Sequence, residues 1–94
     1  MKKVKINDID YVLEKDYKEA FVLEEVMDLC TDYFETFDYI FGDYSYSKLR
    51  LKGFYESTNK KAKDINNING LDAYIMDYCS FDCKYFLLHK EKDK

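Results

Sequence analysis

One stretch of alternating residues constrains the fold of this chain more than any other. Residues 38–54 read DYIFGDYSYSKLRLKGF, with apolar and polar side chains alternating on both sides of a polar centre. A period of two is typical of β-strands, and a polar centre between two such runs is typical of a hairpin turn. The stretch therefore predicts strands near 38–44 and 49–55, joined by a turn over residues 45–48.

The turn also sets the register of the predicted hairpin. With a four-residue turn Asp43 pairs with Arg50, and the other pairs follow in steps of one along both strands. Because successive side chains point to opposite faces, one face carries Ile40, Gly42, Tyr44, Leu49, Leu51 and Gly53. We expect this face to pack against a helix, with the two glycines leaving room for a closely packed element. The opposite face, called the Arg50 face below, carries Tyr39, Phe41, Asp43, Arg50, Lys52 and Phe54.

The rest of the chain predicts a second hairpin, two helices and a closing strand. Alternation around Asn7 and Asp8 predicts a short N-terminal hairpin. Apolar steps of three and four residues predict a helix over 17–36 that begins after a capping pair, Asp16 and Glu19. A second helix is predicted over 70–79, and CKYFLLH predicts a strand over 83–89. We therefore expect a single α+β domain over residues 1–94 in the order ββαββαβ. Its mainly antiparallel sheet has about five strands, both helices pack on one face, and a solvated tail begins at about residue 89.

Composition excludes several classes of protein. Hydrophobic residues make up 47% of the chain, too many for a disordered segment, and the net charge of −4 argues against wholesale binding to nucleic acid or an anionic membrane. We expect no DNA partner. The N-terminus lacks the apolar run of a signal peptide, and no window is apolar enough to span a membrane, which predicts a cytoplasmic protein. Lysine outnumbers arginine 14 to 1, so a preference for lysine is general in this chain and the number of lysines says little about function. Against that preference the single arginine, Arg50, stands out.

No set of residues predicts catalysis, a metal or a cofactor. The three cysteines favour thiols over a disulfide framework. Cys79 and Cys83 have a C-x-x-x-C spacing unlike that of zinc sites, and we expect them to be reduced, metal-free and structural. No serine or cysteine motif of a catalytic triad accompanies His89, so we expect it to lie at a solvated strand end. We therefore expect a protein that is not an enzyme.

The segments DYIFGDYSYSKLRLKGF and YCSFDCKYFLL resemble the YutD-like family, small cytosolic proteins of low-GC Gram-positive bacteria and their relatives. The resemblance extends from about Tyr11 to Leu88, and the hairpin is its most specific part. It implies an α+β domain and leaves the biochemical role open.

The Arg50 face has three interpretations. It is an ordinary strand face on which Arg50 pairs with Asp43, a surface for a protein partner or a second copy of the chain, or a platform for RNA. In the RNA interpretation Tyr39, Phe41 and Phe54 stack on bases while Arg50 and Lys52 bind phosphate. The leading hypothesis is a non-catalytic binding or adaptor module with a protein partner or self-association. The alternative is an RNA- or ribosome-associated factor that uses the Arg50 face.

Overall fold

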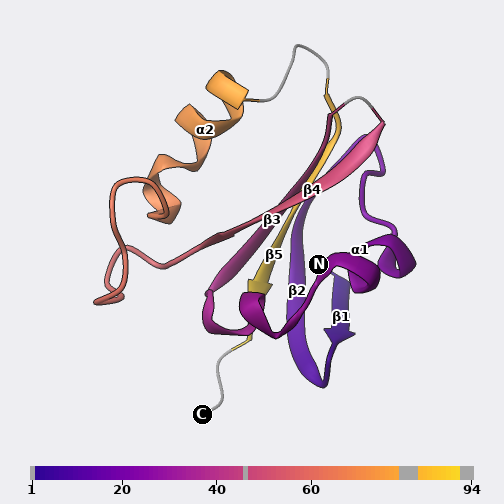
Figure 1. Cartoon of the computed structure of the whole chain (residues 1–94), viewed down its shortest axis with the longest axis horizontal. Coiled ribbons are helices and arrows are strands. Elements are labelled where there is room, and N and C mark those ends of the chain that lie inside the picture. The colour runs from indigo at the N-terminus through magenta and orange to yellow at the C-terminus, as the bar shows by residue number, and fades with distance from the viewer. Residues whose placement is uncertain (1, 46, 79–82, 92–94) are drawn as a thin grey trace.

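The protein is built on one antiparallel sheet of five strands, shown by a computed structural model that describes residues 2–45, 47–78 and 83–91. The strand order is β1-β2-β5-β3-β4. The strands are β1 (Lys2–Ile6), β2 (Ile9–Tyr17), β3 (Tyr39–Ser45), β4 (Lys48–Phe54) and β5 (Tyr85–Lys90). With the two α-helices they give the predicted order ββαββαβ and confirm the α+β class (Figure 1).

Both hairpins form where the sequence predicts them. In the first, Ile6 pairs with Ile9 and the turn residues Asn7 and Asp8 have φ of 52° and 66°, the left-handed region that asparagine and aspartate tolerate. In the second, Asp43 pairs with Arg50 as predicted, and the ladder runs from Tyr39↔Phe54 to Ser45↔Lys48. The pairs expected for a four-residue turn over residues 45–48 are therefore the pairs that form.

The first helix is shorter than predicted. The expected helix over 17–36 is replaced by the end of β2, the helix α1 (Leu23–Leu29) and the 3-10 turn η1 (Asp32–Thr36). Tyr17 belongs to β2, pairs with Tyr85 and stacks on its ring at 5.1 Å. The chain then turns through Lys18 and Glu19, whose φ angles are 60° and 56°. The predicted cap is therefore wrong, because sheet pairing with β5 outweighs the helical spacing of the sequence.

The second helix lies where it was predicted but on the other side of the sheet. It consists of the 3-10 turn η2 (Ile68–Gly70) and α2 (Leu71–Tyr78); Cys79, its predicted last residue, lies outside the described residues. Figure 1 shows α1 and α2 on opposite sides of the sheet. The expectation that both helices cover one face is wrong.

Two hydrophobic cores explain this arrangement. The α1 side of the sheet is filled by Ile6, Tyr11, Leu13, Ala20, Val26, Cys30, Ile40, Phe86 and Leu88. The α2 side is filled by Phe41, Phe54, Leu71 and Leu87. Because the central strand β5 directs large apolar side chains to both faces, each face needs a cover. A single layer of helices could not bury both.

The C-terminal strand also extends further than predicted. His89 and Lys90 belong to β5, and the Glu91 N–H donates to the Asp10 carbonyl at 2.9 Å. The solvated tail expected from residue 89 therefore begins no earlier than the end of this strand.

Candidate functional site

The two hairpin glycines lie on the α1 face, as expected, beneath aromatic rings. A Cβ atom at Gly42 would lie 2.1 Å from the ring of Phe86, and one at Gly53 would lie 2.2 Å from the ring of Phe37. Both distances are far below van der Waals contact, so the rings occupy the space where a side chain would stand. Rings, rather than the predicted helix, are the closely packed neighbours.

The Arg50 face is covered over much of its area by α2. Phe41 and Phe54 are each only 1% exposed. The ring of Tyr74 on α2 contacts both edge-to-face, with centroids 5.7 Å apart. The expectation of an open aromatic platform is therefore wrong for these two rings, because they form the second core.

Arg50 and Asp43 form the ion pair that the register predicted. The guanidinium of Arg50 donates to the two carboxylate oxygens of Asp43 at 3.2 and 2.6 Å. The Asp43 side chain is only 2% exposed, whereas that of Arg50 is 45% exposed. A buried carboxylate needs such a partner, so Arg50 stabilises the hairpin and still reaches the surface. Beside it, the Lys52 ammonium lies over the rings of Phe54 and Tyr74 at 5.1 and 5.6 Å.

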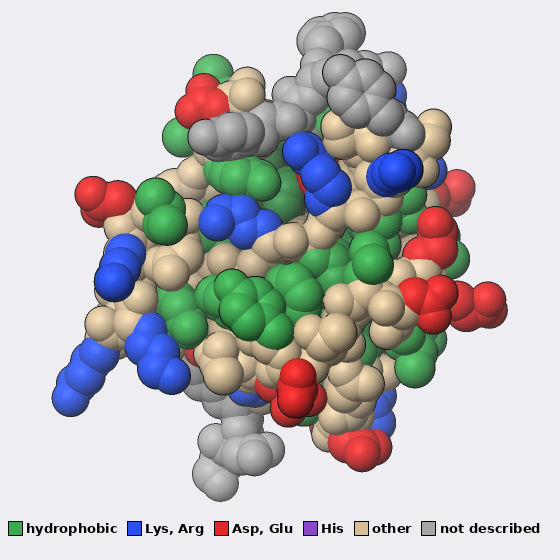
Figure 2. All heavy atoms as spheres, viewed as in Figure 1, with side chains coloured by type: hydrophobic (Ala, Val, Ile, Leu, Met, Phe, Trp, Pro, Cys, Tyr) green, Lys and Arg blue, Asp and Glu red, His purple; other side chains and the backbone are tan. Residues whose placement is uncertain are grey.

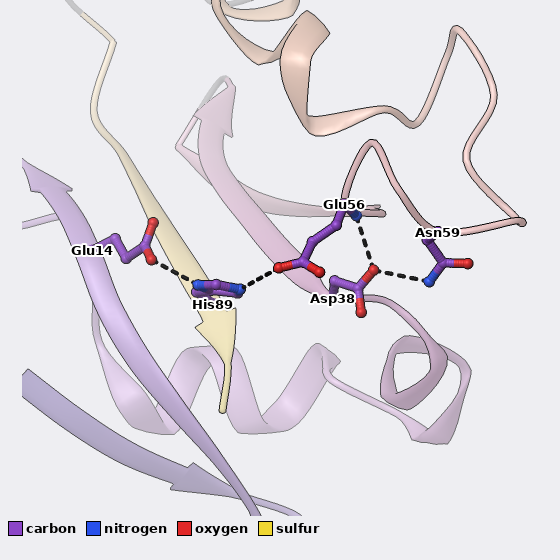
Figure 3. Close-up of polar contacts among 5 residues, drawn as sticks. All are labelled: Glu14, Asp38, Glu56, Asn59 and His89. Carbon is purple, nitrogen blue, oxygen red and sulfur yellow. Dashed lines mark hydrogen bonds and ion pairs between the residues drawn. The ribbon is translucent and has the colours of Figure 1, made fainter. Parts of the chain in front are cut away.

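His89 is the centre of a polar network that the sequence did not predict (Figure 3). Its Nδ1 lies 2.8 Å from Glu14 Oε2 and its Nε2 lies 3.3 Å from Glu56 Oε1. The ring stacks on Tyr39 with centroids 4.1 Å apart. Burial, and then the carboxylates of Glu14, Glu56 and Asp38, raise the pKa of Tyr39. The expectation of a solvated strand end is therefore wrong.

This network fastens the segment that follows β4. Asp38 Oδ2 accepts hydrogen bonds from the Glu56 N–H at 2.9 Å and from the Asn59 amide at 3.0 Å (Figure 3). Both ring nitrogens of His89 face carboxylates, those of Glu14 and Glu56. Glu14 and His89 are 75 positions apart in the chain. No local pattern marks them, because the strand order alone brings them together.

A shallow hollow lies beside this network, between the sheet and the start of α2. Its volume is about 340 Å³. Its walls carry both charges and apolar groups: Glu14, Lys15, Tyr39, Ile68, Asn69, Leu71, Asp72 and Leu87.

The described cysteines are free thiols. Cys30 is buried in the α1 core, and burial raises its pKa, with a smaller contribution from Glu35. Cys83 is half-buried, and Cys79 lies outside the described residues. Within residues 2–45, 47–78 and 83–91, no three His, Cys, Asp or Glu side chains are placed to hold a metal ion. The expectation of reduced, metal-free Cys79 and Cys83 stays a prediction.

Exposed apolar side chains are most frequent around α1 and η1. Of the large apolar residues exposed in the described chain, five lie between residues 22 and 33: Val22, Leu23, Met27, Leu29 and Tyr33. Figure 2 shows hydrophobic side chains gathered across the visible face, with Lys and Arg side chains beside them. Exposed apolar groups that gather in this way mark an interaction surface more often than scattered ones do.

A second hollow opens on this surface at the outer strand of the sheet. We call it the β4 hollow; its volume is about 220 Å³, and it is lined by Tyr33, Phe34, Phe37, Leu51, Lys52, Gly53, Ile65 and Asn66. Within the described chain β4 pairs with β3 alone, so its other edge is open beside this hollow. Neither the edge nor the hollow was predicted, because both depend on the order of the strands.

Residues 5–89, which include most of the five-stranded sheet and the helix on each of its faces, match the family model described as "Putative antitoxin YutD-like". The chain therefore belongs to the YutD-like family. The chain is 39% identical over 85 residues to "Putative antitoxin YutD" of Bacillus subtilis (strain 168), a match that covers 90% of this chain and 93% of that protein. The solution NMR structure of protein yutD from B. subtilis superposes with a TM-score of 0.82 at 35% identity, covering 99% of this chain and 84% of that one. In the described part of the chain no helix is long and apolar enough to cross a membrane.

Proposed function

We propose that the chain is a non-catalytic binding module of the antitoxin type, whose partner is a protein. One observation carries the proposal: apolar side chains are exposed on α1 and η1, and η1 lines the β4 hollow together with the outer strand of the sheet. A protein that gathers apolar groups at its surface is stabilised by covering them. The names of the family and of the B. subtilis relative, which both contain the word antitoxin, agree with a binding role.

The RNA alternative has less support than the sequence suggested. Base stacking on the Arg50 face needs open rings, and α2 covers those of Phe41 and Phe54. Tyr39 stacks on His89 instead. What remains for RNA is the positive charge along β4, which offers contacts for phosphate but no stacking surface.

Recovery of partners from the native cells tests the proposal. The tagged full chain is cross-linked in cells and purified with and without nuclease, and the recovered protein is then combined with the pure chain in vitro. We expect a nuclease-resistant complex that Met27→Ser with Tyr33→Ser weakens. Met76→Ser is the matched control, because Met76 is 82% exposed on α2, across the sheet from this surface. Recovery that disappears with nuclease would favour the RNA alternative, and an effect of Met76→Ser equal to that of the double variant would contradict the proposed surface.

A further inference from the structure

The backbone of β4 presents a row of outward-facing hydrogen-bonding groups. The Tyr44 N–H donates to the Lys84 carbonyl at 3.2 Å and the Asp38 carbonyl accepts from the Lys90 N–H at 2.9 Å, so the even-numbered residues of β3 point toward β5. Its odd-numbered residues therefore point toward β4, where the register pairs them with even-numbered residues. It follows that Leu49, Leu51 and Gly53 direct their N–H and C=O groups away from the sheet.

An extended segment of this chain already uses the end of that edge. Tyr55 is the next outward-facing residue after Gly53. Its N–H donates to the Asn66 carbonyl at 2.7 Å, and its carbonyl accepts from the Ile68 N–H at 2.9 Å. Tyr55 and Asn67 thus form a parallel bridge. At Tyr55 the edge thus pairs with an extended backbone, and among the described residues this bridge is the only one on that side.

We propose that an extended, acidic segment of the partner protein adds to the outer edge of β4 and places an apolar side chain in the β4 hollow. The inference rests on the proposed function and names the chemistry of the partner at the same surface. An added strand would form hydrogen bonds with the outward-facing N–H and C=O groups of Leu49, Leu51 and Gly53, while pockets beside such an edge select the side chains of the added strand. The β4 hollow shares Leu51 and Gly53 with the edge, so a residue paired there has its side chain next to the hollow.

The charge of β4 specifies an acidic segment. Although the chain carries a net charge of −4, this strand reads KLRLKGF and contains three cations and no acid. Arg50 is held by the buried Asp43, whereas Lys48 and Lys52 make no ion pair with an acidic side chain of the described residues. Carboxylates on an added strand would lie opposite these two ammonium groups.

The same charges argue against a second copy of this chain at the edge. Two β4 strands paired edge to edge would bring the cations of both copies together, and like charges on neighbouring strands destabilise the pairing. Lysine on an exposed edge is a common protection against such pairing. The occupant that the strand favours therefore differs in charge from β4 itself.

Selection of displayed peptides tests the inference without knowledge of the natural partner. A library of random ten-residue peptides is selected against the folded full chain. Selected peptides are synthesised, and their binding is followed by backbone amide shifts and hydrogen exchange. We expect the selected sequences to be rich in Asp, Glu and β-branched residues, and the amides of Leu49, Leu51 and Gly53 to become protected from exchange.

Charge reversal on β4 tests the acidic character of the segment. Lys48→Glu with Lys52→Glu should weaken peptide binding about tenfold, because two attractions become two repulsions. The control pair Lys60→Glu with Lys61→Glu, exposed lysines outside β4, should change it less than about twofold.

Each other outcome counts against strand addition. Selected peptides that protect amides outside β4, bind equally well to both double variants, or carry a net positive charge would overturn it, as would a selection that enriches nothing. Binding of poly-uridine RNA that the β4 variant abolishes, in the absence of peptide binding, would assign the charge to RNA instead. A protein partner whose recovery survives Lys48→Glu with Lys52→Glu would leave the proposed function standing and remove only this docking mode.

Discussion

Replacing Gly42 with alanine should destabilise the domain strongly, because the added methyl group meets a ring that cannot move freely. The new Cβ would lie 2.1 Å from the ring of Phe86. Phe86 is fully buried and packs edge-to-face on Phe21 at 5.3 Å. Ordinary contact requires the ring to shift by more than an ångström inside a packed core.

The size of the effect follows from two opposing contributions. Overpacking of this kind costs about 3 kcal/mol, and alanine regains roughly 0.5–1 kcal/mol of the entropy that glycine loses on folding. The net loss is about 2 kcal/mol, or a fall in Tm of about 8–16 °C for a domain of this size. Gly70→Ala is the matched control: its Cβ would lie 3.8 Å from the Asp64 carbonyl, an ordinary contact, so stability should stay equal or rise by up to about 1 kcal/mol.

Urea unfolding, followed by far-ultraviolet circular dichroism and tyrosine fluorescence, measures these differences. The second step is a double-mutant cycle with Phe86→Leu. That change costs about 1–2 kcal/mol alone, but it also removes the ring that alanine would strike. The double variant should therefore be more stable than the sum of the single effects by at least about 1 kcal/mol. An unaltered Gly42→Ala midpoint, or strictly additive effects, would refute the reasoning.

Three further predictions concern the ion pair, the core tyrosine and the network of Figure 3. Arg50→Ala should lower the free energy of unfolding in urea by about 1–3 kcal/mol, because the buried carboxylate of Asp43 loses its ion pair with Arg50. Lys48→Ala should change it by less than about 0.5 kcal/mol. Equal effects of the two substitutions would contradict a stabilising role of Arg50. Burial raises the pKa of Tyr11 to about 12, above the ordinary value of 10.0. The stability that the neutral, buried phenol adds to the folded state is therefore fully present below pH 10 and is lost as the pH rises toward 12. The free energy of unfolding should fall by roughly 2–3 kcal/mol over that window, and Tyr11→Phe should lack this part of the fall; parallel pH profiles for the two proteins would count against it. Asp38→Ala removes the acceptor of the Glu56 and Asn59 bonds, so amide exchange of residues 56–59 should accelerate at least about fivefold while that of β3 and β5 stays slow; unchanged exchange would mean that other contacts hold the segment.

Local pattern was enough to predict much of the sheet from the sequence. The period of two and the turn residues Asn7 and Asp8 place four strands in two hairpins, and the length of the second turn gives the register of the second hairpin. The Asp43–Arg50 pair follows from the same register. These features depend on residues close together in the chain, so local geometry dictates them.

Tertiary structure decided the features on which the proposals rest. The insertion of β5 between β2 and β3 buries both faces of the sheet, draws Tyr17 into a strand, and sends α2 across Phe41 and Phe54. The same insertion brings His89 between Glu14 and Glu56 and leaves β4 at the open edge. The sequence by itself determined which side chains share a face of each hairpin, because alternation along a strand is a local property. Only the folded sheet determined which face is covered and which edge is free, because both depend on the order in which distant strands pair.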